Sequence, residues 1–177
     1  MNRRNLPLPR SPRKSLKVKS NPNTNCGTAL SSKSPVGYIH LRVSAHATED
    51  EDKVLAAVRN ILPSESVDAV VFNKSRLTGY HGNTIVLFSA RIKDKKIAQA
   101  VFTKLCKSLN IIDKETLNSN IKNHLEKGNL YIRLDKQAAY MGELKLGNAD
   151  PVHLRIHFKR HGTEQVVEIC REFGLLP

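Results

Sequence analysis

Two segments in the C-terminal third of the chain alternate strictly between apolar and polar residues. Every second residue is apolar in segment 130–135 and again in segment 152–159. A period of two places the apolar side chains of a strand on one face and the polar ones on the other. We therefore predict two half-buried strands. The outer face of the second would carry only potentially cationic side chains, those of His153, Arg155, His157 and Lys159.

Similar patterns predict three earlier strands. Segment 36–46 alternates between inward apolar residues and an outer face that includes Tyr38, His40 and Arg42. Segment 66–73 is a largely apolar run, typical of a more buried strand, and segment 84–92 follows the same logic. The intervening segment 74–83 contains two glycines, which permit backbone shapes that other residues resist. We expect it to be a loop that exposes Lys74, Arg76, Tyr80 and His81.

Apolar stripes at helical spacing predict four helices, at about 50–62, 94–109, 113–127 and 163–173. Thr48 and Glu51 have the spacing of a capping box, in which two side chains satisfy free backbone amides at a helix start. Asp94 is placed to cap the second helix, and Gly128 to end the third. Strands and helices do not alternate strictly along the chain. We therefore predict a single α+β domain, with a mostly antiparallel or mixed sheet and helices packed on one face.

Residues 1–35 have a different composition from the rest. They hold eight basic residues, no acidic residue and five of the eight prolines. Such a segment buries too little apolar surface to fold alone, so we predict a disordered basic tail followed by a domain at 36–177. An arm that orders on RNA is the favoured interpretation. An organelle leader and an artefact of start-site choice remain open, although the prolines would break the amphipathic helix of a leader.

The net charge of +13 and the pI of about 9.9 favour a polyanionic partner, with nucleic acid first. A basic surface that serves only solubility is the alternative. The three cysteines are far apart and lack CxxC spacing, which argues against a zinc ribbon or a disulfide framework and suits a reducing, cytoplasmic location. No apolar run approaches the roughly 20 residues of a membrane span, so we expect no membrane partner.

Catalytic chemistry is not indicated. His153 and His157 share a strand face, but four residues of strand separate them by roughly 13 Å, too far for one metal ion. The acidic run 49–52 is explained by its place at a helix N-terminus, where carboxylates are favoured. No catalytic or nucleotide-binding motif is present. We predict no catalytic residue, no metal site and no cofactor.

The stretch DKQAAYMGELKLGNADPVHLRIHF, residues 135–158, resembles an archaeal family of small RNA-binding proteins described as predicted exosome subunits. The glycine-rich segment 77–83 resembles an earlier turn of that family. The likeness runs from about Val36 to the last helix and leaves residues 1–35 outside. It implies RNA binding, and a fold like that of the ribosomal protein that binds 5S rRNA.

The predicted function is therefore RNA binding without catalysis. The protein would be an accessory either to RNA processing or degradation linked to the exosome, or to the ribosome. The partners would be a structured or ribosomal RNA and, in addition, exosome or ribosomal proteins. The alternative is a protein-interaction subunit that docks on such a particle without touching RNA. Arginine and lysine would contact phosphates, and tyrosine and histidine would stack on unpaired bases. The candidate RNA-binding residues are Tyr38, His40, Arg42, Arg76, Tyr80, His81, Arg133, Lys136, His153, Arg155, His157 and Lys159.

Overall fold

The computed structural model describes residues 1, 34–79, 82–160 and 162–177. The chain divides into two units, Met1–Ser32 and Lys33–Pro177, and every helix and strand named below belongs to the second. The predicted tail falls almost wholly outside the described residues, as do Tyr80 and His81. The tail therefore stays a prediction.

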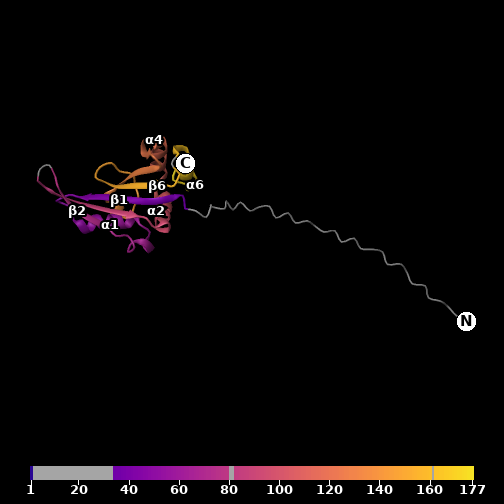
Figure 1. Ribbon diagram of the computed structural model, residues 1–177, viewed down its shortest axis with the longest axis horizontal. Helices are drawn as coiled ribbons and strands as arrows, with labels where there is room; N and C mark the ends of the chain where they lie inside the picture. The colour runs from indigo at the N-terminus through magenta and orange to yellow at the C-terminus, as the bar shows by residue number, and fades with distance from the viewer. Residues whose placement is uncertain (2–33, 80–81, 161) are drawn as a thin grey trace. The chain divides into compact units, whose positions relative to one another are not determined.

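Six strands form one sheet in the order β2-β3-β1-β6-β5-β4, with every neighbouring pair antiparallel. β1 and β6 lie side by side at its centre (Figure 1). The predicted α+β fold and four of the five predicted strands are confirmed. The strands are β1 (Val36–Ala45), β2 (Asn73–Thr78), β3 (Thr84–Ile92), β4 (Leu125–Glu126), β5 (Asn129–Asp135) and β6 (Pro151–Phe158).

The helices pack around this sheet, two of them against its central strand β1 and one against β4 and β5. They are α1 (Glu51–Ile61), α2 (Lys95–Ser108), α3 (Ile111–Ser119), α4 (Ile121–His124), α5 (Lys136–Tyr140) and α6 (Thr163–Glu172), with a 3₁₀ turn at Ser64–Ser66. α1 and α2 both pack against β1 and lie on the same side of it in Figure 1. No helix among the described residues is long and apolar enough to cross a membrane.

The core lies between these helices and the inward side chains of the four central strands. Ile39 and Leu41 of β1 are at most 1% exposed, and the ring of Phe102 in α2 meets that of Phe158 in β6 edge-on, with centroids 5.5 Å apart. Burying one side chain of this size contributes roughly 1.5–3 kcal/mol to folding. Because successive strand residues point to opposite faces, packing this set fixes which polar side chains face outward.

Helix α2 begins as predicted, but α1 does not. Asp94 accepts hydrogen bonds from the amides of Lys96 and Ile97, 2.8 and 3.1 Å away. At α1 the predicted Thr48–Glu51 capping box is wrong. The cap is Asp50, whose carboxylate accepts from the first-turn amides of Asp52 and Lys53. The carboxylate of the neighbouring Glu49 is used elsewhere.

The predicted strand at 66–73 is also wrong, and the loop predicted at 74–83 is wrong for residues 74–78. The apolar run forms a 3₁₀ turn and an irregular segment whose side chains at Val67, Val70 and Phe72 pack on the core. The edge strand β2 is instead built from Asn73–Thr78, all of which are exposed. An edge strand exposed on both faces has no apolar alternation, so hydrophobic periodicity cannot detect it.

Gly128 does not end a helix. The predicted third helix breaks at Asn120 into α3 and α4, and Gly128 lies in the tight turn between β4 and β5. Lys127 and Gly128 have φ values of 46° and 75°. Two positive φ angles are what a type I′ hairpin turn requires, and glycine adopts them most readily. The short helix α5 was not predicted as a helix.

Candidate nucleic-acid interface

Strands that are far apart in the chain bring basic residues into two rows across the outer face of the sheet. In the first row, Arg42 of β1 lies opposite His153 of β6, which in turn lies opposite Arg133 of β5. Directly paired residues of antiparallel strands point to the same face. The three side chains are therefore neighbours on one surface, with a histidine between two arginines.

The second row repeats this arrangement one strand over. His40 of β1 lies opposite Arg91 of β3 on one side and opposite Arg155 of β6 on the other. With strands about 4.8 Å apart, the two arginine backbones of a row are roughly 10 Å apart, and the rows are separated by about 7 Å along the strands. We call these six residues the basic face: Arg42, His153, Arg133, Arg91, His40 and Arg155.

A hollow of about 860 Å³ lies over the basic face, and five of the six residues line it, all except Arg91. One wall comes from α4 and β4, through Asn123, His124 and Glu126. The Nδ1 atom of His124 lies 2.8 Å from the carbonyl oxygen of Tyr131, which ties this wall to β5. Among the described residues that line the hollow, only Glu126 carries a carboxylate. The hollow is therefore strongly cationic.

The arginines of the basic face differ in how they are held. Arg42 and Arg133 are exposed and have no hydrogen-bond or ion-pair partner among the described residues. Arg155 is oriented, because its Nε donates to the side-chain oxygen of Asn129 at 3.1 Å and its Nη2 to the hydroxyl of Tyr38 at 3.4 Å. Two guanidinium groups thus keep all their donors available to an external anion.

Both histidines of the basic face have a lowered pKa. Burial lowers the pKa of His40, and the charges of the surrounding arginines on β1, β6 and β3 lower it further. Burial also lowers the pKa of His153, assisted by Arg133 and Arg42 and opposed by Asp150. Positive charge nearby disfavours a second positive charge. Both imidazoles are therefore mainly neutral at pH 7. A phosphate placed between the arginines would favour protonation of the two histidines.

The ring of Tyr38 is enclosed on both sides. The imidazole of His157 on β6 stacks against it with centroids 4.6 Å apart and planes at 25°. The guanidinium carbon of Arg91 on β3 lies 4.2 Å from its centroid. Because β3 and β6 flank β1 on opposite sides, these two groups occupy opposite faces of the ring.

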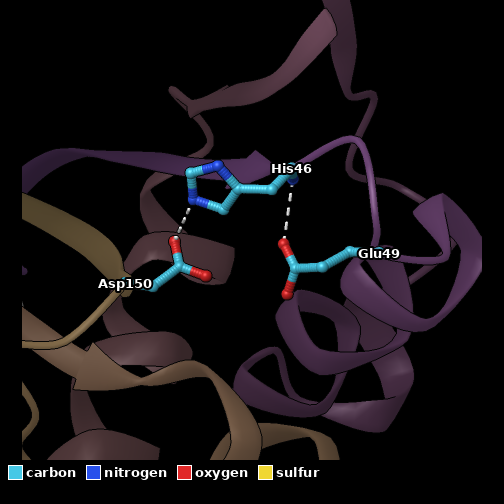
Figure 2. A group of neighbouring side chains, drawn as sticks. All are labelled: His46, Glu49 and Asp150. Atoms are coloured by element: carbon cyan, nitrogen blue, oxygen red, sulfur yellow. Dashed lines mark hydrogen bonds and ion pairs between the residues drawn. The ribbon is translucent and has the colours of Figure 1, made fainter. Parts of the chain in front are cut away.

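A second group of charges lies where β1 ends and β6 begins. We call His46, Glu49, Lys136 and Asp150 the strand-end cluster. The ammonium of Lys136 donates to Glu49 at 2.7 Å, to the carbonyl of Ser44 at 3.0 Å, and to Asp150. Figure 2 shows the imidazole of His46 facing Asp150, 3.3 Å away, and the amide of His46 donating to Glu49 at 2.9 Å.

Three members of this cluster have the chemistry of metal ligands. The ligand atoms of His46, Glu49 and Asp150 lie within 4.8 Å of one another. The side chain of Lys136 is 7% exposed and contacts both carboxylates. The positive charge that a cation would bring is already supplied by this ammonium, so the cluster is accounted for as a structural ion-pair network.

The two described cysteines, Cys106 of α2 and Cys170 of α6, are buried in the core. Burial raises the pKa of the Cys106 and Cys170 thiols to about 12. The thiolate is the nucleophilic form of cysteine. Neither residue is therefore suited to nucleophilic chemistry at neutral pH.

Comparison with known proteins agrees with the character of this face. A family model described as RNA binding matches residues 38–158. The chain belongs to this RNA-binding family. The match runs from β1 to the end of β6 and includes all six residues of the basic face. Helix α6 and the first 37 residues lie outside it.

Two archaeal relatives and two solved structures align with this chain over nearly the full length of each relative. RNA-binding protein PAB1135 from Pyrococcus abyssi is 36% identical over 140 residues, which are 76% of this chain and 91% of the relative. The uncharacterized protein MJ0213 from Methanocaldococcus jannaschii is 32% identical over 146 residues, 77% of this chain and 97% of its own. Among solved structures, the DUF54 protein Mth689 from Methanothermobacter thermautotrophicus has a TM-score of 0.65 at 26% identity, covering 78% of this chain and 97% of its own. Protein AF2318 from Archaeglobus fulgidus has a TM-score of 0.66 at 24% identity, covering 78% and 99%.

The structure separates the twelve candidate residues predicted from the sequence into groups. Seven lie on the outer face of β1, β5 and β6: Tyr38, His40, Arg42, Arg133, His153, Arg155 and His157. Lys159 follows directly on β6, where its ammonium donates to the carbonyl of Ser34. Tyr80 and His81 fall outside the described residues.

The remaining two candidates lie apart from the basic face. Arg76 of β2 pairs with the buried Val86 of β3, so its side chain points to the helix-covered side of the sheet. Lys136 is almost fully buried in the strand-end cluster. Arg91 was missed. In β3, Arg91 is exposed on the outer face and the next residue, Ile92, is buried on the inner face. The alternation of this strand could therefore have identified Arg91.

Proposed function

We propose that this protein binds RNA through the basic face and does so without catalysing a reaction. One observation carries the proposal: Arg42 and Arg133, in one row, have no hydrogen-bond or ion-pair partner among the described residues, and no carboxylate lies between them. Exposed cations are usually solvated individually. Here they are collected on a concave surface, where charges of one sign add and attract a polyanion. The family match and the relative called an RNA-binding protein support the same partner.

Binding without catalysis is supported by the chemistry of the face. A general base or nucleophile needs a partner that orients and activates it. His40 and His153 each lie between two arginines, neither is hydrogen-bonded to a carboxylate among the described residues, and both described cysteines are buried thiols. These groups are suited to neutralising and positioning phosphates.

The cellular role that we propose is accessory: to RNA processing or degradation by the exosome, or to the ribosome. The support is the resemblance of residues 135–158 to archaeal proteins described as predicted exosome subunits. The free thiols of Cys106 and Cys170 suit a reducing compartment, which supports the expected cytoplasmic location.

One feature favours docking on a protein as a second candidate function. Ile111 and Ile112, adjacent residues at the start of α3, are 61% and 69% exposed. Such a pair is a starting point for an apolar protein contact. Salt separates the two functions, because binding to RNA phosphates weakens steeply as salt rises, whereas an apolar contact does not.

The test of RNA binding is the double variant Arg42→Ala/Arg133→Ala, titrated with bulk archaeal rRNA or tRNA. We expect a loss of about 1.5–3 kcal/mol for each charged contact removed, and a shallower dependence of log K on log salt, by about 0.9 per phosphate contact. Stability should change by less than about 0.5 kcal/mol, because both side chains are exposed.

The matched control is Arg59→Ala/Arg171→Ala, which removes two exposed arginines from α1 and α6. It lowers the net charge equally but leaves the basic face intact. If both double variants bind RNA equally well, the basic face is not the RNA site.

A further inference from the structure

The aromatic side chains of the outer face bear on the kind of RNA that it binds. Proteins that recognise single-stranded RNA commonly stack unpaired bases on exposed aromatic rings, whereas double-stranded RNA is recognised mainly through its phosphates and 2′-hydroxyls. The availability of ring faces next to the arginines therefore discriminates between two classes of RNA.

Tyr38 offers no free ring face. His157 and Arg91 cover its two sides, and its hydroxyl accepts a hydrogen bond from Arg155. The ring contacts Arg91 and the hydroxyl contacts Arg155, so Tyr38 orients two arginines of the basic face. A base could stack on Tyr38 only after displacing one of its two neighbours. The expectation that Tyr38 stacks on an unpaired base thus conflicts with its surroundings.

Tyr131 is the other described tyrosine on this face, and it is 38% exposed. The guanidinium carbon of Arg155 lies 5.8 Å from its ring centroid. It lies on β5 beside the wall formed by α4, at one side of the hollow. It is a single, partly covered ring, whereas stacking platforms for single strands hold successive bases on several rings.

The arginines, in contrast, extend over an area. From Arg91 on β3 to Arg133 on β5 the face spans three strand spacings and one row spacing. This places the two outermost arginine backbones roughly 16 Å apart. A duplex carries phosphates on two strands and about twice the charge per length of one strand, about one per 1.7 Å of axis in the DNA case. A two-dimensional field of cations matches such a ligand better than a single line of phosphates does.

Granted the RNA binding proposed above, we propose that the basic face binds the phosphate backbone of base-paired RNA, with Tyr38 as an internal support and not a stacking platform. The two Arg–His–Arg rows contact phosphates of the duplex. Recognition would then depend on the shape and charge of the helix, with little dependence on base sequence.

The experiment compares two forms of one RNA by fluorescence anisotropy, using the full chain at fixed salt and pH. The labelled strand, of a sequence that does not fold on itself, is used alone and annealed to its complement over about 16 base pairs, the length that a double-stranded-RNA domain spans. We expect the duplex to bind about tenfold more tightly than the single strand, given its higher charge density. Equal or tighter binding of the single strand would overturn the proposal and leave RNA binding itself intact. Failure of both RNAs to bind would instead contradict the proposed function.

Two variants test the roles of the rings. Tyr131→Leu should change the affinity for the duplex by less than about twofold, because no base of a duplex is expected to stack on this ring. Where a base does stack, the loss is typically about 1–3 kcal/mol, or five- to 150-fold. Tyr38→Phe keeps both ring contacts and should also bind normally, whereas Tyr38→Leu should weaken duplex binding by releasing Arg91. Thermal melts show whether each variant is folded. A loss of fivefold or more that Tyr131→Leu or Tyr38→Leu confines to the single strand would show base stacking and overturn the proposal.

Discussion

The basic face and the strand-end cluster lie on the same strands, but they treat charge in opposite ways. In the strand-end cluster, the buried ammonium of Lys136 contacts two carboxylates and a carbonyl oxygen. On the basic face, Arg42 and Arg133 have no partner among the described residues, and each histidine lies between two arginines. The first region satisfies its charges within the fold, whereas the second leaves two arginines without a partner among the described residues.

The difference indicates what each region does. Removing one member of a buried ion pair leaves the charge of its partner uncompensated and destabilises the fold, so the pairing in the strand-end cluster is needed for folding once these charges are present. Exposed cations of like sign repel one another and contribute little or nothing to folding, so their collection on one surface supports the RNA contact proposed above. Lys136 and Arg42 were equal candidates in the sequence, and only their surroundings assign them to different roles.

The largest effect on stability is expected from Lys136→Met, which keeps the length of the side chain but removes its charge. We expect a loss of about 2 kcal/mol in the free energy of unfolding. This is below the 3–5 kcal/mol of a fully buried pair, because Glu49 and Asp150 are 30% and 34% exposed. RNA affinity should stay within about twofold of the wild type, because Lys136 lies off the basic face. Urea denaturation and RNA titration measure the two quantities.

The control for this variant is Lys95→Met, at an exposed position in the first turn of α2. It removes the same charge from the surface, so stability should hardly change. A weakened RNA complex with unchanged stability in Lys136→Met would place Lys136 in the RNA site and contradict the comparison.

A smaller effect is expected from giving the basic face an internal partner. Ser89 of β3 lies opposite Arg42, so Ser89→Asp would place a carboxylate beside a free guanidinium. We expect RNA affinity to fall by about 1.4 kcal/mol, or tenfold, and stability to rise by no more than about 1 kcal/mol, as for an exposed ion pair. Ser89→Asn, of the same shape without the charge, is the control. If the two variants bind RNA alike, the charge of Arg42 does not contribute.

The smallest effect concerns pH, which should shift stability and binding in opposite directions. Because the pKa values of His40 and His153 are lowered on folding, the unfolded chain binds more protons below about pH 6.5, the ordinary value. Stability should therefore fall as pH decreases through and below this value. RNA phosphates favour the charged imidazoles, so affinity should rise over the same range, about tenfold for each unit by which a phosphate raises a pKa.

Denaturation and RNA titration between pH 5 and pH 8, repeated with His40→Gln/His153→Gln, isolate this contribution. Both pH dependences should become flatter in the double variant. An unchanged pH dependence of RNA binding would mean that phosphates do not approach these two histidines.

The sequence by itself determined the class of the fold and most of the basic face. Alternation in β1, β5 and β6 identified their outer side chains, because the two faces of a strand follow from local geometry alone. The sequence also placed the cap at Asp94 correctly, since a helix cap depends on a few adjacent residues. Seven of the twelve candidate residues were found on this basis.

The tertiary structure decided which of these residues are neighbours. The order β3-β1-β6-β5 arises from packing between distant segments, and it alone places Arg91 against Tyr38 and each histidine between two arginines. It also removed Lys136 and Arg76 from the face, one into an ion-pair network and the other to the opposite side of the sheet. Periodicity states which face a side chain takes within its own strand. Partners across strands depend on register and burial, which are set by long-range contacts and therefore leave no local trace in the sequence.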